Sequence, residues 1–344
     1  RIAALARVLR PACALALLLC TAGSAAAQLP EVGARARPAE RFVLGDGFWR
    51  ERFGVLRRRT LPHLREQLEQ AGWIARFEAA ASDAGRSGER PEPRSADAEV
   101  YAWVEAVARV IEVDPGASDR AALEASARRI VERICAAQAK DGYLHTSTQL
   151  HPAGVPFADL ETGGELFCAA RLIQAGLAWE RATGDASLRA AGVRFATLIE
   201  TRFGGEERSE IPGAPGIELA LAELARATGR EEWLHLASAF VERRGAESRR
   251  SKWGPERLDQ LPILEGKTAQ GDLASAARLY GGVTQIALLS GWDDYLKSGI
   301  AYGWDIARRR AFPGGVIAGP GRASFGEASD QALRGASAPT VASL

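Results

Sequence analysis

The chain has 344 residues, of which 47% are hydrophobic and 25% are charged, a balance that excludes a disordered or collagen-like protein. Lys and Arg number 44 against 43 for Asp and Glu, so no basic excess points to a nucleic-acid partner.

The first 27 residues have the pattern of a secretory signal peptide. Its features are a basic start at Arg1, Arg7 and Arg10, an apolar run over residues 12–22 and a cleavage site at Ala25-Ala26-Ala27. The run is too short to span a bilayer, and no later segment is long and apolar enough to do so. We therefore expect an exported protein, periplasmic or secreted, with residues 28–40 as a linker rich in Pro, Ala and Arg.

Helical periodicity dominates the chain after residue 40. In the segment that opens at Ser118, apolar residues recur at Leu123, Ala127, Ile130, Ile134 and Ala137, a spacing that places them on one helix face. Ser118 is the expected N-cap. Similar patterns predict helices over residues 49–71, 97–112, 164–182, 186–202, 217–227, 231–243, 267–280 and 293–310, about ten helices in all. Strand alternation is nearly absent, and residues 82–96 are expected to form a polar loop.

The joints between helices repeat a pattern. Gly184, Gly229 and Gly291 each stand where a helix needs a left-handed C-terminal residue, and a new helix with apolar anchors follows each of them. The pattern predicts stacked helical hairpins, which form either an open solenoid or a closed barrel. Periodicity alone does not separate the two.

Two cysteines, Cys135 and Cys168, follow the signal peptide, and both lie in apolar helical patterns. Export permits a disulfide between them, but such residues are more often buried thiols, which is the interpretation we favour. The four histidines are scattered, so nothing local indicates a metal site.

Several strings resemble the catalytic domain of the β-L-arabinofuranosidases of glycoside hydrolase family 127. They are Phe48-Trp49, Asp97 to Ala106 (DAEVYAWVEA), Gln138 to Thr146 (QAKDGYLHT), Glu165 to Thr183, Gly213 to Leu221 (GAPGIELAL), Arg244-Gly245, Gly271 to Val283 and Gly319 to Ala328. The resemblance implies an all-α fold, an (α/α)6-barrel-like array of helical hairpins with a sugar pocket at one mouth. We treat residues 41–344 as this one domain, expected to be incomplete at its C-terminal end and to expose apolar helix faces there.

The family's catalytic apparatus is matched only in part. The resemblance implies a cysteine nucleophile held on zinc and a separate glutamate as acid/base, in a G-E-A-F string that Gly326-Glu327-Ala328-Ser329 resembles. Glu327 is therefore the catalytic candidate, with an exposed loop glutamate as the alternative. The family's zinc-binding string falls near residues 335–338, which contain neither Glu nor Cys, and the chain stops at Leu344 before the region of the nucleophile. We expect no metal, no cofactor and no covalent intermediate of the family's kind.

The histidines that the resemblance places in the pocket are replaced in this chain. Gly164, Arg171, Ala214 and Asp272 stand at those positions. Asp272 is either a second catalytic carboxylate beside Glu327 or, as we favour, the cap of its helix. Glu165 matches the family, as do Glu105 and Glu218. We take Glu165 as the substrate-binding candidate, although a carboxylate on an apolar helix more often ties helix ends or backbone amides.

Three functions remain open. The first is a divergent arabinofuranosidase relative that acts on or binds plant-type or bacterial glycans, such as an arabinose-containing glycan or another oligosaccharide. The second is a glycosidase with a rebuilt two-carboxylate site, and the third is a non-catalytic helical scaffold that binds glycan or protein.

Overall fold

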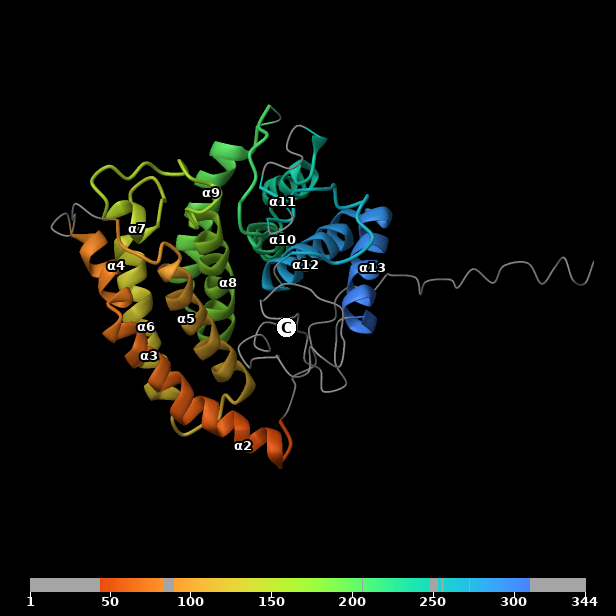
Figure 1. Cartoon of the computed structure of the whole chain (residues 1–344). Helices are drawn as coiled ribbons and strands as arrows, with labels where there is room; N and C mark the ends of the chain where they lie inside the picture. The colour runs from red at the N-terminus through yellow and green to blue at the C-terminus, as the bar shows by residue number, and fades with distance from the viewer. Residues whose placement is uncertain are drawn as a thin grey trace, which may run out of the picture. The chain divides into compact units, whose positions relative to one another are not determined.

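The computed structural model describes residues 44–82, 90–205, 207–247, 253–254, 257–271 and 273–309. Within these ranges the secondary structure is entirely helical (Figure 1). The proposed signal peptide, the linker, Asp272, Glu327 and residues 335–338 lie outside them.

The described chain begins with one continuous helix. It consists of α2 (Phe48–Val55), a π-helical segment η1 (Leu56–Thr60) and α3 (Leu61–Gln70), whose junction residues keep right-handed helical torsions. Gly72, at φ 73°, ends it and leads into α4 (Trp73–Ala81). The helix predicted over 49–71 is confirmed, whereas α4 and the short α7 (Thr146–Gln149) were not predicted.

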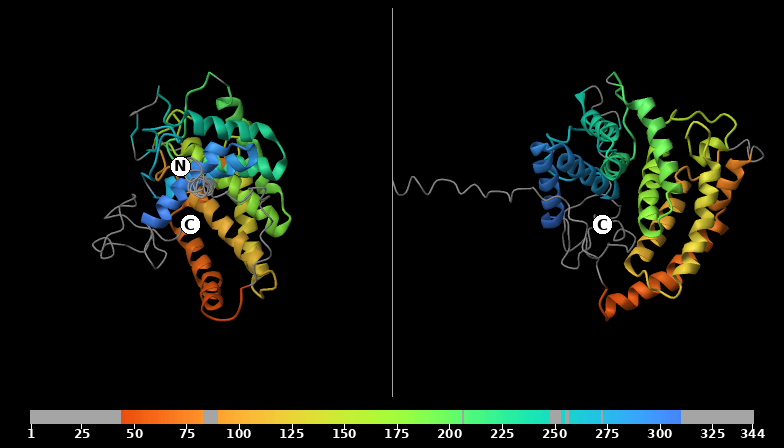
Figure 2. Two further views of the ribbon diagram at one scale, coloured as in Figure 1. Left: turned by 90° about the vertical axis from the view of Figure 1, so that its right-hand side faces the viewer. Right: turned by 180° about the vertical axis from the view of Figure 1, so that it is seen from behind.

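Four helices pack side by side as an inner row, so called because they carry the larger share of the buried side chains. They are α5 (Ala96–Val113), α8 (Glu165–Thr183), α10 (Ile217–Thr228) and α12 (Leu273–Ser290), and each packs on the next in that order (Figures 1 and 2). Each is followed by a helix of an outer row that packs back on it: α6 (Arg120–Ala137), α9 (Ser187–Phe203), α11 (Glu231–Arg243) and α13 (Asp293–Arg309). The predicted array of helical hairpins is therefore confirmed.

The joints between hairpin partners have the predicted geometry. Gly184, Gly229 and Gly291 have φ of 77°, 72° and 71°, the left-handed region that favours glycine. Each donates its N–H to the carbonyl four residues earlier, which completes the last helical turn. The chain can then reverse without leaving those carbonyls unsatisfied.

Two predicted helix starts are wrong for physical reasons. The helix expected from residue 267 begins at Leu273, because Asp305 accepts the N–H of Ala269 at 2.9 Å and holds that segment as a loop. The helix after Ser118 has Asp119 at its N-cap, and the Asp119 carboxylate pairs with Arg57 at 3.0 Å rather than with its own helix.

The core holds both cysteines as free thiols. Cys168 is fully buried on α8, and Cys135 is partly buried on α6. Burial raises the pKa of both thiols, so neither is primed as a thiolate. Both residues are free thiols, as expected, but only Cys168 is fully buried.

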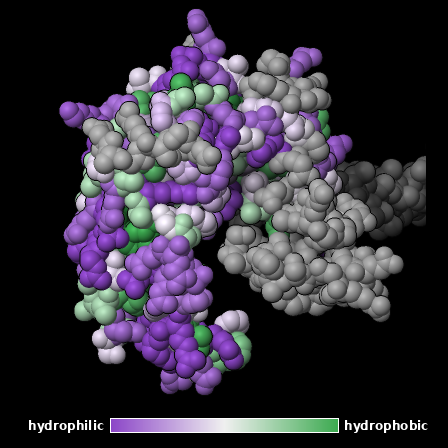
Figure 3. Space-filling model, turned by 60° about the vertical axis from the view of Figure 1, so that its left-hand side comes forward, coloured by the Kyte–Doolittle hydropathy of each residue, from purple (hydrophilic) through white to green (hydrophobic). Residues whose placement is uncertain are grey.

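The outside of the hairpin array is polar. The face that carries α3, α4 and α6 is mainly hydrophilic, with apolar side chains showing between charged ones (Figure 3). None of the described helices combines the length and the apolar character that a membrane span requires.

Glycines bring α8 and α9 into close contact. A Cβ added at Gly176 would lie 2.8 Å from the Cα of Arg189, and one added at Gly192 would lie 3.2 Å from the Cα of Ile173. These contacts are with backbone, so the helices themselves would have to move to admit a methyl group.

We predict that Gly176→Ala destabilises the fold by about 1–3 kcal/mol, because overpacking forces α8 and α9 apart. Gly303→Ala on α13 is the control, since a Cβ there would meet no atom within 4 Å. The control should be neutral or stabilising by up to about 1 kcal/mol, through the higher helix propensity of alanine. Urea unfolding of both variants measures the difference, and equal effects of the two substitutions would contradict the close contact.

Candidate functional site

The helices of the inner row open onto a common cavity at their N-terminal ends. Its volume is about 280 Å³. Its walls include Ser95 before α5, Gly164 and Glu165 at the start of α8, Gly213 and Ala214 before α10, Ser275 and Arg278 near the start of α12, and Arg257 from the loop before α12. Four helix N-termini therefore surround one cavity, and their unpaired amide ends favour anionic or hydroxyl groups there.

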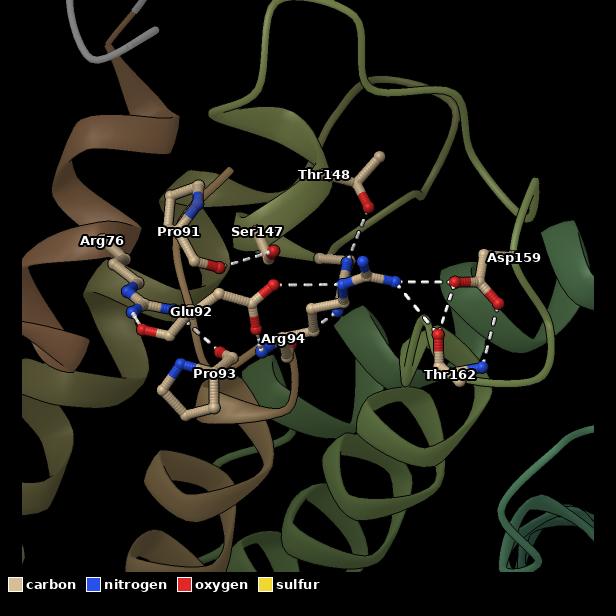
Figure 4. A network of polar contacts seen from close by, with 10 residues as sticks. Arg76, Pro91, Glu92, Pro93, Arg94, Ser147, Thr148, Asp159 and Thr162 are labelled. Atoms are coloured by element: carbon tan, nitrogen blue, oxygen red, sulfur yellow. Dashed lines mark hydrogen bonds and ion pairs between the residues drawn. The ribbon is translucent and has the colours of Figure 1, made fainter. Parts of the chain in front are cut away.

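One wall of the cavity is the loop that precedes α8. The Asp159 carboxylate pairs with Arg94 at 2.6 Å and accepts the N–H and hydroxyl of Thr162 (Figure 4). Partial burial works to raise the pKa of Asp159, but the hydrogen bonds from Thr162 and the charge of Arg94 lower it overall. Asp159 is therefore an ionised, already compensated group that holds the loop in place.

The same arginine is anchored from the opposite side. The Arg94 carbonyl lies 2.9 Å from Nε2 of His145, whose Nδ1 lies 2.9 Å from the hydroxyl of Thr148. Ser147 donates to the carbonyl of Pro91 at 2.8 Å (Figure 4). The segment before α5, the turn of α7 and the loop before α8 are thus one hydrogen-bonded unit.

Asp97 links two of the motif strings. It is 1% exposed and accepts the N–H of Thr146 at 2.7 Å and its hydroxyl at 2.5 Å. The start of α5 is thereby fixed to the start of α7, although the residues are 49 positions apart. This aspartate is structural, because both carboxylate oxygens are used inside the protein.

Glu165 lines the cavity, but its carboxylate also accepts hydrogen bonds from other groups of the protein. Its Oε1 accepts the hydroxyl of Tyr143 and the N–H of Phe157, the latter at 2.8 Å. Phe157 adopts a left-handed φ of 59°, and its ring packs against those of Tyr143, Phe195 and Phe203. Burial, and then the nearby charge of Glu165, raise the pKa of Tyr143, so the phenol stays protonated as a donor. Whether Glu165 also contacts substrate stays a prediction.

Glu218 and Arg244 form an ion pair that is wholly buried. Both side chains are 0% exposed and lie 3.0 Å apart. The other oxygen of Glu218 accepts the N–H of Gly216 at 2.8 Å. Arg244 also donates to the carbonyls of Pro212 at 2.8 Å and Arg257 at 2.7 Å. The pair thus fixes two segments that line the cavity.

Glu105 forms ion pairs with two arginines and does not line the cavity. It pairs with Arg109 at 3.2 Å and with Arg171 at 3.3 Å. Arg171, which stands at one of the family's histidine positions, is therefore directed toward α5. The expectation that the matched glutamates tie helix ends or backbone amides holds for Glu218, which accepts the N–H of Gly216, whereas Glu105 forms ion pairs with side chains.

The structure brings some predicted positions together and leaves others untested. Gly164, Glu165 and Ala214 share the cavity. Asp272 and Glu327 lie outside the described residues, so their separation and the proposed cap of Asp272 stay predictions. Arg257, Asp159 and Arg278 were not predicted as site residues, since a charged residue in a loop or on a helix has no sequence pattern that distinguishes a site from a solvated surface.

Whether a zinc site is present stays a prediction, because residues 335–338, where the resemblance places zinc ligands, lie outside the described residues. No cluster of three His, Cys, Asp or Glu residues that could hold a metal occurs among the described residues. Cys168 is fully buried on α8, and burial raises the pKa of its thiol. Cys135 lies on the outer-row helix α6, outside the cavity wall.

Comparisons with known proteins agree with the motif strings. A family model described as the GH127 catalytic domain of beta-L-arabinofuranosidase matches residues 43–340. The non-reducing end beta-L-arabinofuranosidase of Bifidobacterium longum subsp. longum is 28% identical over 247 residues, which are 64% of this chain and 37% of that protein.

Solved structures show the same fold. The GH127 beta-L-arabinofuranosidase Ara127N-Se of Geobacillus stearothermophilus T6 superposes with a TM-score of 0.74 at 28% identity, over 83% of this chain and 48% of that one. A second GH127 beta-arabinofuranosidase gives a TM-score of 0.74 at 23% identity and is covered to 45%. The predicted barrel-like array is confirmed, and the chain spans less than half the length of these relatives.

We predict that Glu218→Gln destabilises the protein by about 3–5 kcal/mol, because it leaves the buried Arg244 guanidinium without its counter-charge. The matched control is Glu112→Gln, which removes the partner of Arg181 in a solvent-exposed pair with side chains 39% and 45% exposed. That change should cost less than about 1 kcal/mol. Thermal and urea unfolding compare the two, and a similar small cost in both would show that the buried pair does not hold the fold.

Proposed function

This chain belongs to the GH127 family of β-L-arabinofuranosidase catalytic domains, and from that membership we propose that it is an exported glycan-binding protein. The sugar is held in the cavity at the N-terminal ends of the inner row. Its natural ligands are plant-type or bacterial glycans, such as an arabinose-containing oligosaccharide.

The convergence of the motif strings on one cavity carries this proposal. Glu165, Ala214 and Ser275 belong to three strings that are far apart in the sequence, yet all three line the same space. One buried ion pair and several hydrogen bonds hold the loops that form the wall around them. A polar, pre-formed cavity of this kind suits a ligand with many hydroxyl groups.

Export is supported by the N-terminal pattern alone. A basic start, a short apolar run and an Ala-Ala-Ala cleavage site precede Gln28. Removing residues 1–27 would remove three arginines and change the formal charge from +1 to −2. An extracytoplasmic location also suits a protein whose ligands are polysaccharides outside the cell.

Hydrolysis is the activity to test, with Glu327 as the proposed acid/base. Its G-E-A string resembles the position of that residue in the family. Residues 335–338 offer no Glu or Cys to zinc, so we propose that this protein does not use the family's zinc-cysteine site. A non-catalytic role and a two-carboxylate glycosidase are both outcomes of the experiments below.

We predict that Ala214→Trp abolishes glycan binding, because the indole would fill a cavity of about 280 Å³. Ala227→Trp, an exposed position near the end of α10, is the size-matched control and should bind like the unmodified protein. Calorimetric titration with arabinofuranose-containing oligosaccharides measures both. Binding that survives in Ala214→Trp would place the sugar elsewhere.

We predict that the purified protein contains no stoichiometric zinc and that any aryl glycosidase activity persists in EDTA. In Glu327→Gln that activity should fall by about 100-fold or more, the usual loss when a general acid is removed. Glu231→Gln on the exposed side of α11 is the control. Elemental analysis and an aryl glycoside screen test both parts. One tightly held zinc per chain, or full activity in Glu327→Gln, would contradict the assignment.

A further inference from the structure

The cavity contains charged groups that a neutral sugar does not require. Its described lining includes three carboxylates, of Asp159, Glu161 and Glu165, and two guanidiniums, of Arg257 and Arg278. Which ligand fits the cavity depends on the ion pairs and hydrogen bonds that these charged side chains already form within the protein.

Two of the three carboxylates already interact with other groups of the protein. Asp159 is paired with Arg94 at 2.6 Å. Glu165 is 4% exposed, and its Oε1 takes hydrogen bonds from Tyr143 and Phe157. Only Glu161 is exposed, where it can accept hydrogen bonds from sugar hydroxyls.

Arg257 is a cation with no anionic partner within the part of the chain that the structure describes. Its backbone is nonetheless fixed, since its carbonyl accepts a hydrogen bond from Arg244 at 2.7 Å and its N–H donates to Gly254 at 3.1 Å. The buried pair of Arg244 and Glu218 therefore places this guanidinium at the cavity.

Arg278 is seated on the other wall. Its guanidinium lies over the ring of Phe167, 5.0 Å from the centroid. Its stem lies against Gly216, where an added Cβ would be 3.4 Å from the Arg278 Cδ. Ser275 lies one helical turn earlier and faces the same cavity. Arg278 is thus held by packing, not left as a mobile surface side chain.

We infer that this cavity selects an acidic sugar, a uronic acid residue whose carboxylate is bound by Arg257 and Arg278 while its hydroxyls face Glu161 and Ser275. This inference rests on the proposed function. A guanidinium matches a carboxylate with two parallel hydrogen bonds. A neutral sugar in the same place would remove water from the Arg257 guanidinium without supplying a negative charge to it. The binding of a neutral sugar is therefore disfavoured.

The test compares ligands that differ only in charge. Trigalacturonic acid, its fully methyl-esterified form and neutral arabinotriose are titrated into the full chain by calorimetry at low and at moderate NaCl. The acid should bind about tenfold or more tightly than its ester, in keeping with charge-assisted hydrogen bonds. Its affinity should fall as NaCl rises, while that of the ester stays constant.

Arginine variants assign the effect to the cavity. Arg257→Gln and Arg278→Gln should each weaken binding of the acid by about tenfold and leave the ester unchanged. Arg257→Lys, which keeps the charge, should retain part of the affinity. Arg226→Gln, an exposed arginine near the end of α10, is the control and should bind as before. Circular dichroism and the melting temperature confirm that each variant is folded.

Each other result overturns the inference in a distinguishable way. Equal affinity for acid and ester, or arginine variants without effect, rules out carboxylate recognition in this cavity. Binding of arabinotriose alone rules out an acidic ligand but leaves the proposed function standing. If none of the three sugars binds, both the inference and the proposed function fail.

Discussion

The buried ion pair between Glu218 and Arg244 is the constraint on which the cavity depends. Its members are on different hairpin helices, or just beyond them, and neither touches water. Each also forms hydrogen bonds with backbone groups: Glu218 with Gly216, and Arg244 with Pro212 and Arg257. Because desolvating two charges is costly, such a pair is a poor source of stability compared with apolar packing. Its value here is positional, since it fixes the loops before α10 and before α12 at the same place.

A second set of contacts fixes the segments before α5 and before α8, which form the other half of the cavity wall. Asp97 holds Thr146, and Arg94 holds Asp159. Both sets use charged groups near helix N-termini, where backbone amides lack partners within the helix. The consequence is a rim in which Asp159 and Glu165 already form interactions within the protein, whereas Glu161 is exposed. The proposed glycan-binding site and its proposed selectivity therefore depend on the same network.

Sequence patterns predicted the helices well because their apolar faces are buried by neighbours with the same period. The predictions failed where a side chain from a distant element competes for backbone amides, as Asp305 does for Ala269. The glutamates of the site could be found through the motif strings, and their attachment to backbone could be anticipated from the apolar helices that carry them. Arg257 and Arg278 could not. Arg257 is distinguished by having no acidic partner among the described residues, and Arg278 by its position over the ring of Phe167. Both properties exist only after folding.

The separation of hairpins from rim loops has an evolutionary consequence. The glycine contacts between α8 and α9 and the left-handed joints fix the scaffold with residues that do not line the cavity. The rim is built by short connecting segments, and the side chains that meet a ligand there are few. Substitutions at those positions can therefore change specificity while the scaffold stays under its own, separate selection. Gly164 and Ala214, where the resemblance places histidines, are two such lining positions, and their small side chains change the cavity wall without changing a helix-to-helix contact.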